Sequence, residues 1–480
     1  MYSDPLREAI AEAEQLVAAA PHIETEADLL EGLQYLAGCI AGCMHLAFDY
    51  ERDHPFLQSG TGPFTKMGLD NPDTLYFGTR LQANRDYVVS GRRGTTTDLS
   101  FQLLGGEYTD YNVPASQAAF DDRELDIAAD GSFEWRLRPS APGQLVIREV
   151  YGDWSQQRGT LAIARLDTVG TAPPPLTREL MEKRYATAGS QLVNRVKTWL
   201  QFPQWFYLNI PVNTMVAPRL TPGGLATQYS SAGHFELRPG QALVITVPVS
   251  DAPYLGFQLG SMWYISLDYI NHQTSLNASQ AQADPDGKVR IVVAEQNPGV
   301  TNWVETLGHR RGFLQFRWQR VSRELTEADG PTVELVDFDA IPAALPHYQH
   351  NKISEDDWRR ELRCVNGKSR PGCWDDRDAQ AQGDRRQWRR TGAGHDAGAP
   401  MCARRRRSGA GCAQRGASRR RRQADHRHRA TGGGGAHRHH RRRRRKQPCA
   451  GHAGGVRQGR RADQQRVPGA IDETIGRHHI

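Results

Sequence analysis

Two stretches of the sequence each bring a histidine close to a carboxylate. The first holds Asp268 and His272, and the second holds Glu305 and His309. A histidine beside a carboxylate can act as a general base, because imidazole titrates near neutral pH. These four residues are therefore the catalytic candidates of an enzyme whose reaction the sequence does not specify.

Asparagine and aromatic residues surround these candidates, and such residues could bind a small molecule. The same residue types also have structural roles, since asparagines build turns and tryptophans fill the cores of β-sandwiches. Both interpretations stay open. The ligand-binding candidates are Trp263, Tyr264, Asn271, Asn302 and Trp303.

No metal and no cofactor is predicted. Two histidines and two carboxylates could hold a metal ion, but their spacing matches no zinc or iron motif. Cys39 and Cys43 lie four residues apart without a second ligand pair, so buried thiols are favoured over a metal or redox site. The sequence also lacks a Gly-x-Ser-x-Gly turn, a phosphate-binding loop and a His-Glu-x-x-His motif.

Charge divides the chain near residue 365. Residues 1–365 carry a net charge of −14 and residues 366–480 carry +21, which together give the net +7 of the chain. The basic segment contains no Leu, Phe or Tyr. It cannot bury enough apolar surface to offset its chain entropy, so a disordered tail is predicted over 365–480. Its arginine runs predict salt-sensitive, non-specific attraction to nucleic acid and no specific nucleic-acid partner.

A change of reading frame explains the composition of this tail, because GC-rich codons read out of frame encode Arg, Gly, Ala and His. Shifted by one nucleotide, residues 387–395 permit a glycine-rich turn and residues 455–466 permit an Asn-Asn-Ala word. Both words resemble short-chain dehydrogenases. We interpret the tail as the frameshifted remnant of such an NAD-dependent oxidoreductase, whose cofactor motifs the translated tail has lost.

Other features predict a cytoplasmic protein without a membrane partner. The N-terminus lacks the basic and apolar pattern of a signal peptide, and the most apolar run, residues 35–48, is too short to span a bilayer. Five of the seven cysteines lie at or beyond Cys364, so the body has no disulfide framework. The oligomeric state is not predicted.

Periodicity predicts helices over residues 4–20, 25–50 and 176–200, and short strands elsewhere. One of the predicted strands is Trp263–Leu267. Three words recur at an offset of 156 residues, and residues 145–148 recur as 314–317 at an offset of 169. Matches at one offset indicate an internal repeat. The recurring words are residues 87–89 with 243–245, 101–103 with 257–259, and 130–131 with 286–287.

The fold class predicted from these patterns is mainly β, with two tandem lobes of the jelly-roll or β-sandwich type, N-terminal helices and a connecting helix. Such lobes can hold a small molecule at a barrel mouth. The main functional prediction is therefore a small-molecule-binding module, with the enzyme and the dehydrogenase remnant as alternatives. The predicted segments are 1–58 (helical), 59–170 (first lobe), 171–205 (helical connector), 206–350 (second lobe) and 365–480 (tail).

The second lobe resembles the bacterial domain of unknown function 1214 family. The resemblance rests on the run Tyr254–Trp263, on residues 266–277 and 297–303, and on Arg317-Trp318. Upstream, the first lobe resembles the related 1254 family. This resemblance implies tandem jelly-roll lobes but no reaction and no catalytic residues. The upstream words are Asn71–Tyr76, Phe101-Gln102-Leu103, Arg148 and Asp153-Trp154.

Overall fold

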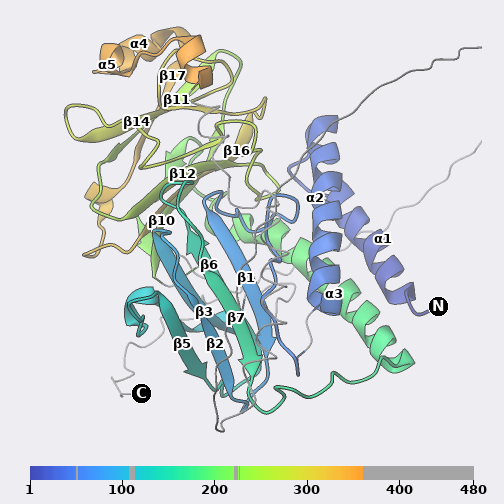
Figure 1. Cartoon of the computed structure of the whole chain (residues 1–480). Helices are drawn as coiled ribbons and strands as arrows, with labels where there is room; N and C mark the ends of the chain where they lie inside the picture. The colour runs from blue at the N-terminus through green and yellow to red at the C-terminus, as the bar shows by residue number, and fades with distance from the viewer. Residues whose placement is uncertain (50–51, 107–113, 221–224, 226, 361–480) are drawn as a thin grey trace, which may run out of the picture. The chain divides into compact units, whose positions relative to one another are not determined.

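The computed structural model describes residues 1–49, 52–106, 114–220, 225 and 227–360. These residues form a strand-rich structure with three long helices and four β-sheets (Figure 1). The predicted tail and its dehydrogenase-like words lie outside the described residues. Among the helices described, none is long and apolar enough to cross a membrane.

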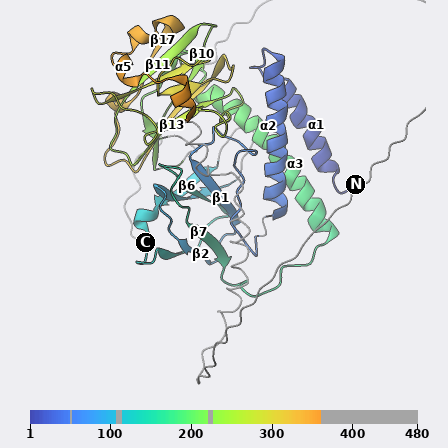
Figure 2. The ribbon, with the colours of Figure 1, turned by 45° about the horizontal axis from the view of Figure 1, so that its top comes forward.

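The three predicted helices are confirmed as α1 (Asp4–Ala18), α2 (Glu26–Met44) and α3 (Arg178–Phe206). A capping box starts α2, in which Thr25 and Asp28 exchange side-chain to backbone hydrogen bonds. The side chain of Thr177 caps α3. A short π-helix, His45–Asp49, extends α2. The three helices run side by side in both views and share a buried apolar cluster (Figures 1 and 2).

The first lobe contains two sheets, ordered β1-β6-β3-β4 and β5-β2-β7. All of its strand pairs are antiparallel. The strands are β1 (Thr74–Leu81), β2 (Tyr87–Arg92), β3 (Asp98–Gly105), β4 (Ala115–Asp121), β5 (Ser132–Leu137), β6 (Gly143–Val150) and β7 (Thr160–Arg165).

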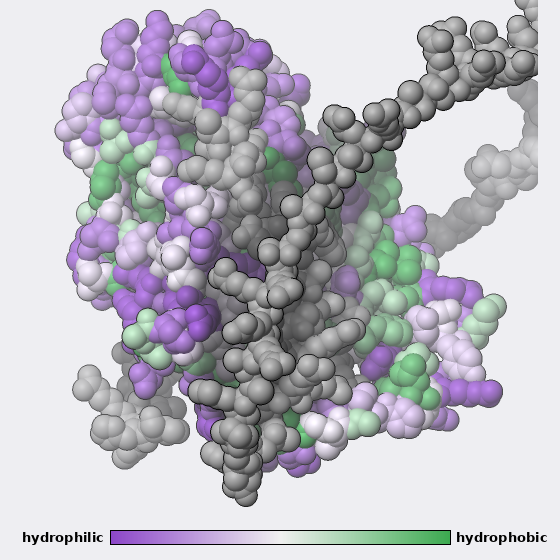
Figure 3. All heavy atoms as spheres, in the orientation of Figure 1, coloured by the Kyte–Doolittle hydropathy of each residue, from purple (hydrophilic) through white to green (hydrophobic). Residues whose placement is uncertain are grey.

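The second lobe contains two further sheets, ordered β13-β12-β16-β10-β8, with β9 on β10, and β15-β14-β11-β17. Its pairs are antiparallel except the parallel pair β14–β15. Figure 3 shows hydrophilic residues gathered over the end that carries β17 and α4. The elements are β8 (Thr214–Met215), β9 (Arg219–Leu220), β10 (Gln228–Glu236), β11 (Gln241–Pro248), β12 (Tyr254–Gly260), β13 (Ser275–Asn277), β14 (Lys288–Ala294), β15 (Trp303–Glu305), β16 (Arg311–Gln319), β17 (Thr332–Asp337), α4 (Ile341–Ala344) and α5 (Tyr348–Asn351).

The internal repeat is visible in the strand order. β1-β6-β3-β4 of the first lobe corresponds to β10-β16-β12-β13 of the second, and β5-β2-β7 corresponds to β14-β11-β17. The register agrees with both sequence offsets, because Phe101 pairs with Ile147 where Phe257 pairs with Phe316. In each lobe these aromatic and aliphatic residues lie in one buried core to which both sheets contribute.

The strand predicted over Trp263–Leu267 is wrong. β12 ends at Gly260, and the chain then turns, with the Tyr264 amide donating to the Ser261 carbonyl at 2.9 Å. Tyr264 has a φ of +57°, which an extended strand does not allow. The apolar residues of this segment are buried because the turn packs against helices, and their burial imitates the pattern of a strand.

An arginine at the end of β16 joins the two lobes. Arg320 donates from Nη1 to the Thr97 carbonyl at 2.5 Å and from Nη2 to Asp122 Oδ1 at 2.8 Å. Its Nε lies 3.6 Å from Asp98 Oδ1. Burial raises the pKa of Asp98 to about 7, although the charge of Arg320 opposes the rise. The guanidinium therefore neutralises carboxylates that would otherwise repel one another.

We expect the substitution Arg320→Gln to lower the free energy of unfolding by about 3 kcal/mol near pH 8, since it leaves buried acceptors and charge without a donor. The loss should shrink near pH 5, where Asp98 is protonated. Urea unfolding at the two pH values measures both effects. Arg323→Gln is the matched control, because Arg323 forms an exposed pair with Asp329, and exposed pairs contribute little to stability. Equal losses in the two variants would contradict the role given to Arg320.

Candidate functional site

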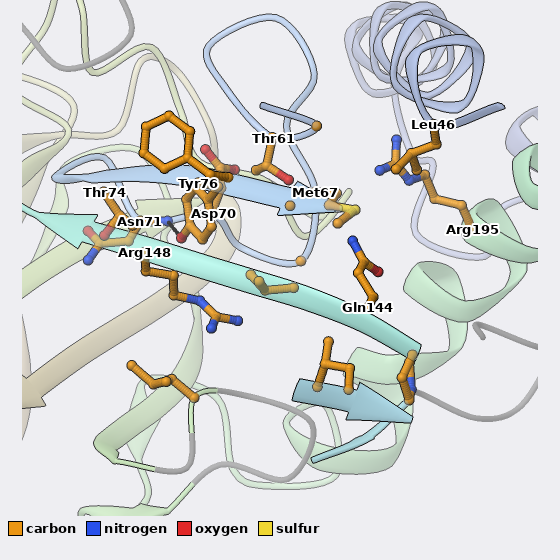
Figure 4. Close-up of a pocket in the computed structure, with 18 of the residues that line it drawn as sticks. Leu46, Thr61, Met67, Asp70, Asn71, Thr74, Tyr76, Gln144, Arg148 and Arg195 are labelled. Atoms are coloured by element: carbon orange, nitrogen blue, oxygen red, sulfur yellow. Dashed lines mark hydrogen bonds between the residues drawn. The ribbon is translucent and has the colours of Figure 1, made fainter. Parts of the chain in front are cut away.

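A cavity of about 290 Å³ lies between the two lobes and α3 (Figure 4). β1 and β6 of the first lobe form one wall, and β10 and β16 of the second lobe contribute another. Helix α3, the segment 60–71 and the turn that carries Tyr264 contribute further lining residues. The cavity therefore depends on parts of the chain that are far apart in sequence.

Strand alternation directs polar side chains into this cavity. On β16, Leu314, Phe316 and Trp318 enter the core of the second lobe, so the intervening residues face the opposite side. β6 behaves in the same way, with Leu145 and Ile147 in the core of the first lobe. The residues on the cavity faces are Gln144, Val146 and Arg148 of β6 and Gln315, Arg317 and Gln319 of β16.

Each lobe supplies a glutamine–arginine pair at equivalent positions of the repeat. Arg148 donates from Nη1 to Gln102 Oε1 at 2.8 Å, and Arg317 donates from Nη1 to Gln258 Oε1. Arg317 also donates from Nη2 to the Leu69 carbonyl and, at 2.8 Å, to Gln315 Oε1. Both arginines line the one cavity.

The Tyr76 side chain lies close to the charges of both arginines. The Arg148 guanidinium is 5.9 Å from the Tyr76 ring centroid. Burial raises the pKa of the Tyr76 hydroxyl, and the charges of Arg317 and Arg148 oppose the rise, so both charges are close to it. The Tyr76 hydroxyl accepts a hydrogen bond of 2.9 Å from the backbone N–H of Asn71. We call Tyr76, Arg148 and Arg317 the inner cluster.

A second group of positive charges lies at Arg80 of β1 and Arg195 of α3. Burial raises the pKa of the Cys43 thiol, and the charges of Arg195 and Arg80 both oppose that rise. A Cβ atom at Gly42 would lie 2.4 Å from Arg195 Nη1, so the Arg195 side chain passes close to α2 at this glycine. We call Arg80 and Arg195 the outer cluster; Figure 4 shows Arg195 and Arg148 on opposite sides of the cavity.

Positive charge dominates the described lining. Arg52, Arg80, Arg148, Arg195 and Arg317 face a single carboxylate, that of Asp70. Asp70 accepts hydrogen bonds from the amide and the hydroxyl of Ser266, at 3.1 and 2.8 Å. Burial raises the pKa of Asp70, with the nearby Lys66 charge acting in the opposite direction. The described lining of the cavity thus carries a net positive charge.

Several buried polar atoms of the lining have no hydrogen-bond partner among the described residues. They are one donor and two acceptors, in side chains that come from three different elements. Buried groups of this kind are costly unless a ligand or water satisfies them. The atoms are Asn71 Nδ2, Gln191 Oε1 and Gln319 Oε1.

The catalytic candidates do not converge on this cavity. His272 Nδ1 lies 2.9 Å from Glu305 Oε2, so these two residues are brought together across different segments. Asp268 instead accepts from the amide and side chain of Asn271. His309 lies 3.2 Å from Glu31 Oε1 of α2. Burial disfavours the charged His309, but the hydrogen bond and charge of Glu31 prevail and raise its pKa.

Of the ligand-binding candidates, Tyr264 lines the cavity. Asn271 forms the turn with Asp268, and Asn302 bonds to the backbone of Gln282 at 2.8 Å in both directions. Trp263 is buried against α2, and Trp303 is buried in the second lobe with its indole donating to the Ala294 carbonyl. These four side chains have structural partners.

A second hollow, of about 680 Å³, lies on the second lobe beside His309. Its described lining carries both signs of charge, with Arg238 and Arg310 opposite Glu295, Asp337 and Asp339. Mixed charges of this kind favour no ligand class. Among the described residues no three histidine, cysteine or carboxylate side chains form a group that could hold a metal ion.

Sequence reasoning missed most residues of the cavity, although a signal was present. Gln315, Arg317 and Gln319 alternate with large apolar residues, which indicates a strand with one apolar and one polar face. Arg148, Arg317 and the Asn71–Tyr76 segment stood among the words that carry the family resemblance. What the pattern could not indicate is that the polar faces of the two lobes meet.

No family model and no curated protein matches the chain. The solved structure of an uncharacterized protein from Burkholderia cenocepacia is similar, with 25% identity and a TM-score of 0.64, over 70% of this chain and 96% of that one. A Vibrio parahaemolyticus protein overlaps at 10% identity and a TM-score of 0.34, over 68% and 100% of the two chains. A Bacillus subtilis oxalate decarboxylase mutant overlaps at 10% identity and a TM-score of 0.16, over 64% and 82%. The first similarity supports the fold, and the other two scores are too low to support any argument.

The turn that places Tyr264 in the cavity is anchored on the N-terminal helices. The Trp263 indole donates to the Asp28 carbonyl at 2.9 Å, and its ring lies edge-on to His22 at 4.3 Å. Burial lowers the pKa of His22 to about 4, whereas Asp28 and Glu31 oppose this shift. His22 is therefore neutral in the fold at neutral pH.

We expect His22 to make the fold less stable in acid. The unfolded chain binds a proton at this histidine near pH 6.5, and the folded chain binds it only near pH 4. The free energy of unfolding therefore falls as the pH is lowered from 6.5 to 4, by roughly 3 kcal/mol in total. His22→Phe keeps an aromatic ring against Trp263 and should remove this loss. The pH dependence of urea unfolding in the two proteins measures the difference. The pKa of His309 is shifted in the opposite direction, but this histidine is present in both proteins. Parallel curves of unfolding free energy against pH in the two proteins would contradict the assignment to His22.

Proposed function

We propose that the chain is a small-molecule-binding module that holds an organic anion in the cavity between two jelly-roll-like lobes. The observation that carries the proposal is that Arg148 and Arg317, each bonded to a glutamine at equivalent positions of the repeat, both line this cavity. A guanidinium presents several donors in one plane and suits a carboxylate or phosphate better than any neutral group.

The charge balance of the cavity supports an anionic ligand. Arginine keeps its charge in proteins, so the five guanidiniums of the described lining stay positive at any physiological pH, against one carboxylate in the same lining. Bringing such charges together in a partly buried space costs free energy, which an incoming anion recovers. The volume of about 290 Å³ is at the lower end of the range for ligand pockets.

The family resemblance agrees with this assignment. Asn71, Tyr76, Arg148 and Arg317, which carry part of the resemblance to the domain of unknown function 1214 and 1254 families, line the cavity. The enzyme alternative keeps one supporting observation, the 2.9 Å contact between His272 and Glu305. A cytoplasmic location stays a prediction.

The proposal is tested by calorimetric titration of the full chain with octanoate and octylamine, which share a chain and differ in charge. We expect octanoate to bind and octylamine not to bind. The Arg148→Gln variant should bind octanoate about tenfold more weakly, because one charge-assisted hydrogen bond is lost.

Arg136→Gln is the matched control, since Arg136 lies on β5 and forms an exposed pair with Glu134. It should leave octanoate binding unchanged. Equal binding of the amine, or an equal loss in the Arg136 variant, would refute an anion site in this cavity.

A further inference from the structure

The positive charges of the cavity are divided between its two ends. Tyr76 pairs with Arg148 at one end of β1, and Arg80 pairs with Gln144 at the other. Four strand positions separate Tyr76 from Arg80, which corresponds to about 13 Å along the strand. The inner cluster and the outer cluster therefore lie at opposite ends of an elongated cavity.

The wall between the two clusters is apolar or small. Gly78 of β1 pairs with Val146 of β6 at the midpoint between the two ends, and both line the cavity. Met67 also lines it, and Figure 4 shows this side chain between Tyr76 and Arg195. Charged groups are thus separated by a stretch that suits methylene or ring carbons.

The two clusters differ in the elements that carry them, because the inner cluster lies on strands and the outer cluster combines Arg80 of β1 with Arg195 of α3. The inner cluster depends on sheet contacts, because Arg317 is held by Gln258, Gln315 and the Leu69 carbonyl. In the outer cluster Arg195 is held on α3 beside Gly42 of α2. A ligand with an anionic group at each end would therefore meet arginines at both ends of the cavity.

Resting on the proposed function, we infer that the ligand is an elongated organic dianion, with one anionic group at the inner cluster, one at the outer cluster and an apolar body between them. Asn71 Nδ2 lies at the inner end, and Gln191 of α3, one helical turn before Arg195, lies at the outer end. Asn71 Nδ2 gives the inner end a further hydrogen-bond donor for the anionic group, whereas the unpartnered atom of Gln191 is an acceptor, Oε1.

The test is a chain-length series of α,ω-dicarboxylates, titrated into the full chain by calorimetry with octanoate as the monocarboxylate reference. Succinate is too short to reach both clusters, so we expect affinity to rise through adipate and suberate. Suberate should bind about tenfold or more tightly than octanoate, because it meets a second guanidinium site.

Two variants assign the ends. Arg80→Gln and Arg148→Gln should each reduce suberate affinity to about that of octanoate in the wild-type protein, whereas Arg136→Gln should keep the preference for suberate. Thermal melts establish that the variants fold, and the length series in the wild-type protein decides the question even if one does not.

The outcomes separate this inference from the proposed function. Octanoate and all dicarboxylates binding equally would overturn the dianion while leaving a single anion site in place. Tightest binding of succinate would overturn the two-ended arrangement. Failure of every carboxylate to bind would overturn both proposals.

Discussion

A permanent positive charge in the interior, that of Arg317, is the constraint on which much of the structure depends. Arg317 is 7% exposed, and a guanidinium cannot avoid the free-energy cost of burying its charge by losing its proton. Acceptors must therefore surround it. Gln258 of the neighbouring strand β12 and Gln315 of β16 itself provide two, and the carbonyl of Leu69 provides a third from the segment that precedes β1. This last bond fixes residues 69–71, and with them the floor of the cavity, to the second lobe.

The same positive charges that favour an anion oppose folding in its absence. The structure limits this cost by giving Arg317 and Arg148 glutamine acceptors, which are neutral and leave the charge of each guanidinium in place. Arg320 differs, because the carboxylates of Asp98 and Asp122 balance its charge. Positive charge is thus balanced at the Arg320 contact that joins the lobes, whereas the described lining of the cavity keeps an excess of it.

Local patterns predicted much of the fold and little of the site. The capping sequence at Thr25 and the apolar spacing of α2 and α3 are local signals, and the helices follow them. The repeated words at Phe101 and Phe257 predicted equivalent strands, and the strand order agrees. The cavity could not be predicted because it requires Leu69 to meet Arg317 and Gly42 to meet Arg195, contacts between residues far apart in sequence. Trp263 was misleading, because burial against a helix resembles burial in a strand.

The equivalence of the two lobes suggests how such a cavity could arise. One lobe alone carries one glutamine–arginine pair and only half of the surrounding wall. Two identical lobes, associating as a symmetrical homodimer, would enclose a cavity with matching halves. Duplication and fusion into one chain would free each half to diverge, and the register shows the result: Tyr76 pairs with Arg148 where Ser230 pairs with Arg317. An ancestral symmetrical cavity would have favoured a symmetrical ligand, and the present asymmetry permits one whose two ends differ.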